Sequence, residues 1–255
     1  MAKNDFFGES AENYEQKCLC VFVLDISGSM NEIVDNTNVI DTGRQVFVDG
    51  KTYNIVEGGI SKLDNLNEGL RNFYDEISNN STTSQRLEIA IIAFNDQVNC
   101  LQSPSLITNM TMPVLQANGE TALVDAMNEA IDLVSDRKNW YKSTNQTYYR
   151  PWIILITDGE PNHGQDVETL AARIKKDCND KRYAFLPIGV DGANMKILEQ
   201  LQGNLPAMKL KGTKFGAFFN WLSASMGTVV TAEEGQVDLH NGMDDWMEKM
   251  FTEVK

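Results

Sequence analysis

The sequence predicts an α/β protein with a doubly wound, Rossmann-like, mostly parallel sheet that is flanked by helices. Two observations carry this prediction. Four continuous apolar runs have the length of strands, and the stretches between them place apolar residues at helical spacing. Strands that alternate with helices of this length form βαβ units, whose crossovers cover both faces of a parallel sheet.

The predicted strands are apolar throughout, as expected where both faces of a sheet are buried. They span residues 18–24, 87–94, 152–156 and 183–188. The predicted helices instead repeat their apolar residues every three or four positions. They span residues 63–77, 123–134, 167–174 and 215–222.

One segment interrupts this alternation directly after the first strand. Residues 44–56 contain two β-rich runs that flank Asp49 and Gly50. An Asp-Gly pair between such runs is a strong signal for a tight hairpin turn. We therefore expect an inserted β-hairpin beside the end of the first strand.

The predicted domain covers residues 18–227, with an N-terminal extension at 1–17 and an acidic tail at 228–255. From residue 231 onward the tail carries seven carboxylates against two lysines, together with several apolar residues. It is expected to form a terminal helix that folds back on the domain. A docking segment for a partner is the alternative.

Composition restricts the partners and the compartment. The formal net charge is −14 without a long basic run, which argues against nucleic acid and anionic membranes as partners. The N-terminus lacks the apolar core of a signal peptide, and no apolar run approaches the roughly 20 residues of a membrane helix. We expect a cytoplasmic protein.

The four cysteines include no Cys-x-x-Cys pair, so buried thiols are expected rather than a zinc site or disulfides. Only two histidines are present, which excludes a histidine-rich metal site.

Oxygen ligands follow the first predicted strand. Asp25, Ser27 and Ser29 alternate along the chain, and strand-like spacing would point them to one side. Gly28 lets the backbone turn between the two serines. One carboxylate and two hydroxyls suit a hard cation.

Two more segments bring oxygen atoms to the same edge of the sheet. Asp158 follows the third predicted strand, and Thr121 precedes a predicted helix, which its hydroxyl is expected to cap. The carboxyl ends of the strands form the binding crevice of open α/β sheets. Taken singly, each of these side chains has a simpler explanation as a cap or turn residue. Together they predict a metal site.

These three segments resemble the metal-ion-dependent adhesion site of von Willebrand factor A (VWA) domains. The resemblance implies the VWA fold over residues 18–227. It assigns Asp25, Ser27, Ser29, Thr121 and Asp158 as ligands of Mg²⁺, Mn²⁺ or Ca²⁺, with Asp158 often acting through water. It also implies a non-enzymatic module that binds the Asp or Glu of a partner protein through the metal.

Within this family the chain is most similar to bacterial tellurite-resistance proteins of the TerY type, on residues 23–30, 66–70 and 218–225. That similarity implies a stress-response system with a kinase and a phosphatase as possible partners. Two features depart from the pattern, namely the hairpin insertion and Glu120 at a position where glycine is common. Glu120 is expected either to face solvent or to approach the metal's outer shell.

Two other functions fit parts of this sequence pattern. A haloacid-dehalogenase-like, Mg²⁺-dependent phosphatase also begins with a strand that ends in Asp, but it needs a second carboxylate two residues later, where this chain has Ser27. A metal-free structural scaffold on the same fold is the third possibility.

Overall fold

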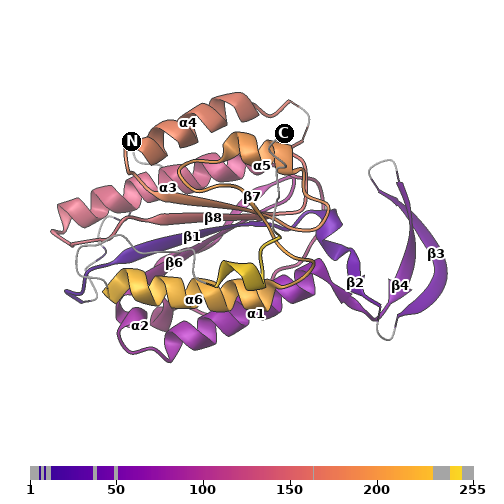
Figure 1. The fold of residues 1–255 in the computed structure, drawn as a ribbon, viewed down its shortest axis with the longest axis horizontal. Coiled ribbons are helices and arrows are strands. Elements are labelled where there is room, and N and C mark those ends of the chain that lie inside the picture. Colours follow the sequence, from indigo (N-terminus) through magenta and orange to yellow (C-terminus); the bar gives the residue numbers. More distant parts are fainter. Residues whose placement is uncertain are drawn as a thin grey trace.

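The computed structural model describes residues 6, 9, 13–36, 39–48, 51–162, 164–231 and 242–248. Its centre is a six-stranded sheet in the order β10-β9-β8-β1-β6-β7, in which only the β6–β7 pair is antiparallel (Figure 1). The strands are β1 Cys18–Asp25, β6 Leu87–Phe94, β7 Val98–Leu106, β8 Trp152–Thr157, β9 Ala184–Gly189 and β10 Met208–Lys209. The predicted fold class is confirmed.

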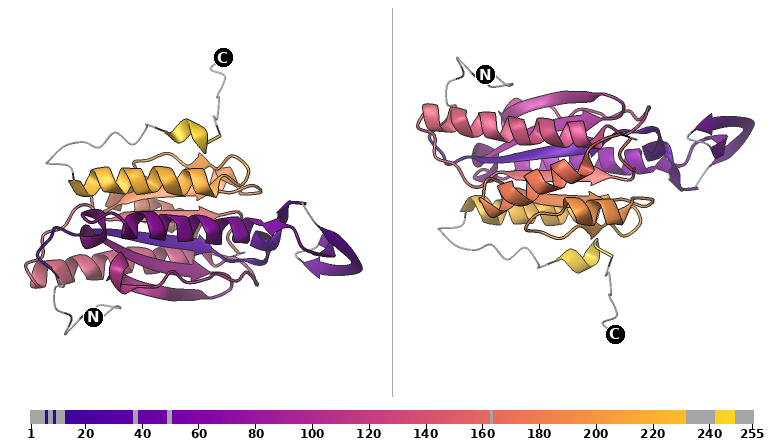
Figure 2. Two further views of the ribbon diagram at one scale, coloured as in Figure 1. Left: turned by 90° about the horizontal axis from the view of Figure 1, so that it is seen from below. Right: turned by 90° about the horizontal axis from the view of Figure 1, so that it is seen from above.

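Helices cover both faces of the sheet (Figure 2). One face carries α1 Lys62–Ser78, α2 Thr83–Arg86 and α6 Phe215–Thr231. The other carries α3 Leu123–Ser143, α4 Val167–Asn179 and α5 Met195–Leu201. Because side chains alternate along a strand, Phe22 of β1 enters the first core and Val23 the second. The continuous apolar run of β1 thus contributes side chains to the hydrophobic cores on both faces of the sheet.

The α1–α6 contact explains the glycine in the middle of α1. A methyl group on Gly69 would collide with the Phe219 ring of α6. Phe219 packs in turn against Phe22 and Phe73, with ring centroids 6.0 and 5.9 Å away. The close approach of the two helices therefore outweighs the low helix propensity of glycine.

Several short or edge elements were not predicted. β7 is an edge strand in which polar and apolar residues do not alternate regularly. α2 and α5 are too short for their apolar residues to show a helical period. The expectation of buried thiols is wrong for Cys100, which lies exposed on β7, while Cys18, Cys20 and Cys178 are buried.

The inserted hairpin is confirmed and is longer than predicted. β3 Ile40–Val48 pairs with β4 Lys51–Glu57, and the predicted turn residues 49 and 50 lie outside the described residues. A smaller ladder joins β2 Ile33–Asp35 to β5 Ile60–Ser61 at its base. Figure 1 shows the β3–β4 hairpin projecting away from the body of the protein.

The predicted tail helix lies largely outside the described residues. α6 continues past residue 227 to Thr231, and residues 242–248 contain one 3-10 turn, Met243–Asp245. Trp246 is fully buried and packs against Trp221 of α6, with ring centroids 5.1 Å apart. This part of the tail therefore folds onto the domain. Among the described residues, no helix is long and apolar enough to cross a membrane.

Candidate metal centre

The oxygen-bearing residues lie at the carboxyl ends of two neighbouring strands in the middle of the sheet. Asp25 ends β1, Thr157 ends β8, and Asp158 follows directly. From β1 the chain builds the sheet outward through β6 in one direction and through β8 in the other. This reversal of strand order is where open α/β sheets form their binding crevice.

Asp25 is fully buried and held by two hydrogen bonds. Its Oδ1 accepts from the Ser27 backbone N–H at 2.8 Å, and its Oδ2 accepts from Thr157 Oγ1 at 2.5 Å. Burial raises the pKa of Asp25 to about 6, against the lowering effect of the Ser27 and Thr157 hydrogen bonds, and Asp158 raises it further. A nearby cation would favour the charged carboxylate.

Ser27 and Ser29 place their hydroxyls side by side, with 3.1 Å between the two Oγ atoms. Two adjacent ligands of an octahedral Mg²⁺ at about 2.1 Å are about 3.0 Å apart. A 3-10 turn, Gly28–Asn31, produces this arrangement, so the expected strand-like alternation is wrong beyond Ser27. The sequence nevertheless identified the correct neighbours.

Thr121 approaches the same place from the loop before α3. Its backbone N–H donates to Asn162 Oδ1 at 2.8 Å, and its carbonyl accepts from the Asn162 N–H at 3.0 Å. A methyl group on Gly159 would lie 3.0 Å from Thr121 Oγ1 and 3.3 Å from Asp25 Oδ2, so both oxygens border one small space. The predicted capping role is wrong: Ala122 is the N-cap of α3, without a side-chain cap.

Asp158 connects the first loop to α1. Its Oδ1 accepts from Ser29 Oγ at 2.7 Å, and its Oδ2 accepts from Lys62 Nζ at 2.9 Å. Lys62 is itself buried and also pairs with Glu32 at 2.6 Å. Burial alone would lower the pKa of Lys62, but the bonds to Glu32 and Asp158 raise it above its ordinary value.

Lys62 was not predicted as part of the site, because a lysine at the start of an amphipathic helix normally faces solvent. The available signal is its position directly after Ser61, the N-cap of α1, where it is the first residue of the helix. Thr157 was missed as well, although it directly precedes Asp158 at the end of a buried strand. Glu120 is exposed, as one of the two expectations had it.

Backbone hydrogen bonds hold the first and second loops together. Gly28 N–H donates to the Gly119 carbonyl at 3.0 Å, and Asn118 N–H donates to the Ile26 carbonyl at 2.9 Å. Gly119 has a φ of +73°, which a residue with a side chain rarely adopts. The ligand positions on these loops are thus set by the backbone.

The donor set fits a hard divalent cation. It comprises three neutral hydroxyls and two carboxylates, all oxygen, which are the ligands of Mg²⁺, Mn²⁺ and Ca²⁺. In the part of the chain that the structure describes, no group of three or more His, Cys, Asp or Glu side chains offers a softer alternative.

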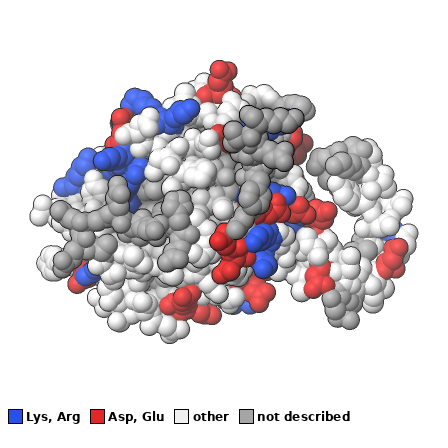
Figure 3. Space-filling model, in the orientation of Figure 1, with Lys and Arg blue, Asp and Glu red and all other residues white. Residues whose placement is uncertain are grey.

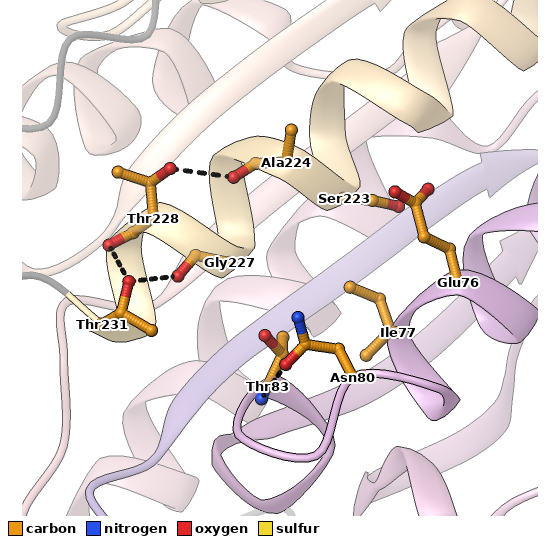
Figure 4. Close-up of a pocket in the computed structure, with 9 residues that line it drawn as sticks. All are labelled: Glu76, Ile77, Asn80, Thr83, Ser223, Ala224, Gly227, Thr228 and Thr231. Carbon is orange, nitrogen blue, oxygen red and sulfur yellow. Dashed lines mark hydrogen bonds between the residues drawn. The ribbon is translucent and has the colours of Figure 1, made fainter.

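A separate cavity of about 330 Å³ lies between α1, α2 and α6 (Figure 4). Short polar side chains line it, and the buried hydroxyls of Thr83 and Ser223 have no hydrogen-bond partner there. Glu76 is its one charged lining residue. This composition offers neither a nucleophile with a base nor a set of metal ligands.

The match to a known family decides the identity of the domain. Residues 20–209 match the model of the von Willebrand factor type A domain. The chain belongs to this family. VWA domains generally mediate protein–protein interactions, commonly through a metal-ion-dependent adhesion site. A search of curated proteins finds no match.

Solved structures share the VWA fold at low sequence identity. The D319A mutant of the PilB minor pilin from Streptococcus sanguinis has a TM-score of 0.58 at 13% identity, covering 86% of this chain and 64% of PilB. This chain therefore spans less than two thirds of that protein. BatB from Bacteroides thetaiotaomicron has a TM-score of 0.50 at 16% identity, covering 84% of this chain and all of BatB.

Proposed function

We propose that this VWA domain is a non-enzymatic module that binds a partner protein through a divalent cation. Asp25, Ser27, Ser29 and Thr121 would hold the ion, with Asp158 binding directly or through water. The observation that carries the proposal is that the paired serine hydroxyls meet two buried carboxylates at the ends of neighbouring strands.

The ligand set determines what the site would recognise. When bound, Mg²⁺, Mn²⁺ or Ca²⁺ would supply an electrophilic position for the carboxylate of a partner's Asp or Glu. The serine and threonine ligands carry no charge, and Lys62 neutralises part of Asp158, so the site would retain an attraction for an anion. The repulsion of an acidic partner by the net charge of −14 is screened over about 8 Å at physiological salt.

Phosphatase chemistry is disfavoured by the contacts of Ser27. A haloacid-dehalogenase-like mechanism needs a second carboxylate two residues after the nucleophile, to act as acid and base. Ser27 stands at that position, and its hydroxyl contacts Ser29. Metal-dependent hydrolysis of a generic phosphate ester, lost in Asp25→Asn, would overturn the non-enzymatic proposal.

Finer features of the proposal rest on the sequence resemblance to TerY-type proteins. On this basis the protein would act in a bacterial, cytoplasmic stress-response system of the tellurite-resistance kind. Its partner would be a kinase or a phosphatase. Pull-down from the native host, with and without chelator, tests them. Recovery of the same proteins in both conditions would contradict metal-dependent binding.

The metal site is tested by calorimetric titration of the full chain with Mg²⁺ and Mn²⁺. We expect saturable binding in the wild type, and a loss of about tenfold or more in affinity in Ser27→Ala, which removes one ligand. Ser81→Ala is the matched control, because Ser81 is exposed in the loop before α2. No metal binding in the wild type would leave the metal-free scaffold as the better description.

A further inference from the structure

A second cavity, of about 420 Å³, lies between α3 and α4, at the opposite end of the sheet from the metal centre. Tyr183, which lines it, directly precedes the first residue of β9, whereas the metal centre follows the last residues of the parallel strands β1 and β8. Helix α3 contributes Lys138 and Lys142 to its wall, and Arg182 adjoins Tyr183.

The lining is basic although the chain is strongly acidic. Four cations line the cavity against two carboxylates, which leaves a net charge of +2. Both carboxylates are already paired: Asp132 with Arg173 at 2.5 Å, and Asp177 with Arg182 at 3.3 Å. In Figure 3, Lys and Arg atoms gather on the side where Figure 1 draws α3 and α4.

Neither lysine forms a close ion pair of this kind. Lys138 Nζ donates to the Arg182 carbonyl at 2.9 Å, and no described carboxylate forms an ion pair with Lys138 or Lys142. Burial lowers the pKa of Lys138, and the charges of Lys142, Arg182 and Arg150 lower it further, whereas the charge of Asp177 raises it. The cations of the lining therefore outnumber its carboxylates, and a bound anion would offset the excess positive charge.

Tyr183 adds an independent indication of a ligand. The side chain is 1% exposed, and its hydroxyl has no hydrogen-bond partner in the described structure. A buried hydroxyl without a partner is destabilising, so native proteins usually satisfy such groups. Tyr183 lines the cavity next to Arg182, so a ligand bound there could give this hydroxyl a partner.

We propose that this cavity binds a phosphate group. A phosphate monoester carries a charge between about −1.5 and −2 at pH 7, which matches the net charge of the lining. Lysine ammonium groups bind phosphate as point charges, and the Tyr183 hydroxyl supplies a directional donor. A small phosphorylated metabolite and a phosphorylated side chain of a protein share this chemistry.

The test is titration calorimetry of the full chain, treated with EDTA and then dialysed into chelator-free buffer of low chloride, with inorganic phosphate and with capped phosphoserine as probes. EDTA removes any metal, so the result is independent of the metal centre. We expect saturable binding that weakens about tenfold in Lys138→Gln and in Lys142→Gln. Tighter binding of phosphoserine would identify a protein side chain as the source, and tighter binding of inorganic phosphate a small molecule.

Two further variants distinguish a built site from diffuse attraction. Lys175→Gln removes the same charge from an exposed position on α4 outside the cavity, and we expect unchanged binding. Tyr183→Phe is expected to weaken binding several-fold without lowering the melting temperature, because its hydroxyl has no partner to lose. No binding in the wild type, or equal weakening by Lys175→Gln and Lys138→Gln, would overturn the proposal.

Discussion

Lys62 Nζ donates to Asp158 Oδ2 at 2.9 Å, so one carboxylate of the proposed metal centre is already paired with a cation of the protein. Their side chains are only 2% and 0% exposed. The ion pair orients Asp158 so that its other oxygen accepts from Ser29. It also places a fixed positive charge next to the ion that the site is proposed to hold.

We therefore predict that Lys62→Met binds Mg²⁺ about tenfold more tightly, since it removes a repulsive charge from a poorly solvated site. The same change should lower the free energy of unfolding in EDTA by about 3–5 kcal/mol, because Asp158 loses its buried partner. Calorimetry and urea unfolding measure the two effects, with Lys175→Met as the control. Unchanged or weaker affinity would show that positioning of Asp158 outweighs charge repulsion.

Gly159→Ala should weaken metal binding while leaving the fold intact. The added methyl would lie 3.0 Å from Thr121 Oγ1 and 3.3 Å from Asp25 Oδ2, so one of these oxygens has to move. We expect a loss of about tenfold in Mn²⁺ affinity, measured by electron paramagnetic resonance. Gly216→Ala on α6 is the control, because its methyl would meet no atom within 4 Å. Equal affinities would mean that Thr121 is not a ligand.

The raised pKa of Asp25 predicts how metal-free stability depends on pH. In the folded chain this pKa is about 6, against 3.8 for the ordinary carboxyl, so between these values the folded state binds more protons than the unfolded state. The contribution of Asp25 to the free energy of unfolding therefore falls as pH rises from about 4 to 6, then levels off. Urea unfolding in EDTA should show this decline in the wild type relative to Asp25→Asn. Parallel pH profiles would contradict it.

The buried ion pair between β6 and α3, which lies far from the metal centre, should contribute strongly to the free energy of unfolding. Arg137 binds Glu88 through Nε at 2.9 Å and Nη2 at 2.8 Å, and both side chains are 4% exposed. We expect Arg137→Met to cost about 3–5 kcal/mol, because Glu88 stays buried without its cation. Arg173→Met, which breaks a partly exposed pair, should cost below about 1 kcal/mol. Similar losses in urea unfolding would contradict this difference.

Much of the fold could be predicted because long apolar runs and helical spacing are local properties of the chain. The four predicted strands and four long helices all form. The edge strand β7 escaped detection because it has one neighbour and a mixed pattern. In the candidate site, Asp25, Ser27, Ser29, Thr121 and Asp158 were recognisable from strand ends and motif order, and the structure brings them together.

What escaped prediction depended on contacts between distant segments. The ion pair of Lys62 with Asp158 joins residues 96 positions apart, and no local sequence pattern predicts it. Ala122 took the capping position expected of Thr121 because Asn162 binds the backbone of Thr121. These errors concern how the side chains are held, and the role of the five residues as metal ligands stays a prediction.

The projecting hairpin has a consequence for how this protein can evolve. Phe47 and Tyr53 are 70% and 45% exposed, so substitutions there remove little from the hydrophobic cores. Between relatives, the length and sequence of β3 and β4 are thus expected to drift quickly, while the loops around Asp25 and Asp158 remain fixed. The protein could therefore gain a new binding partner through substitutions in the hairpin alone, while its fold stays the same.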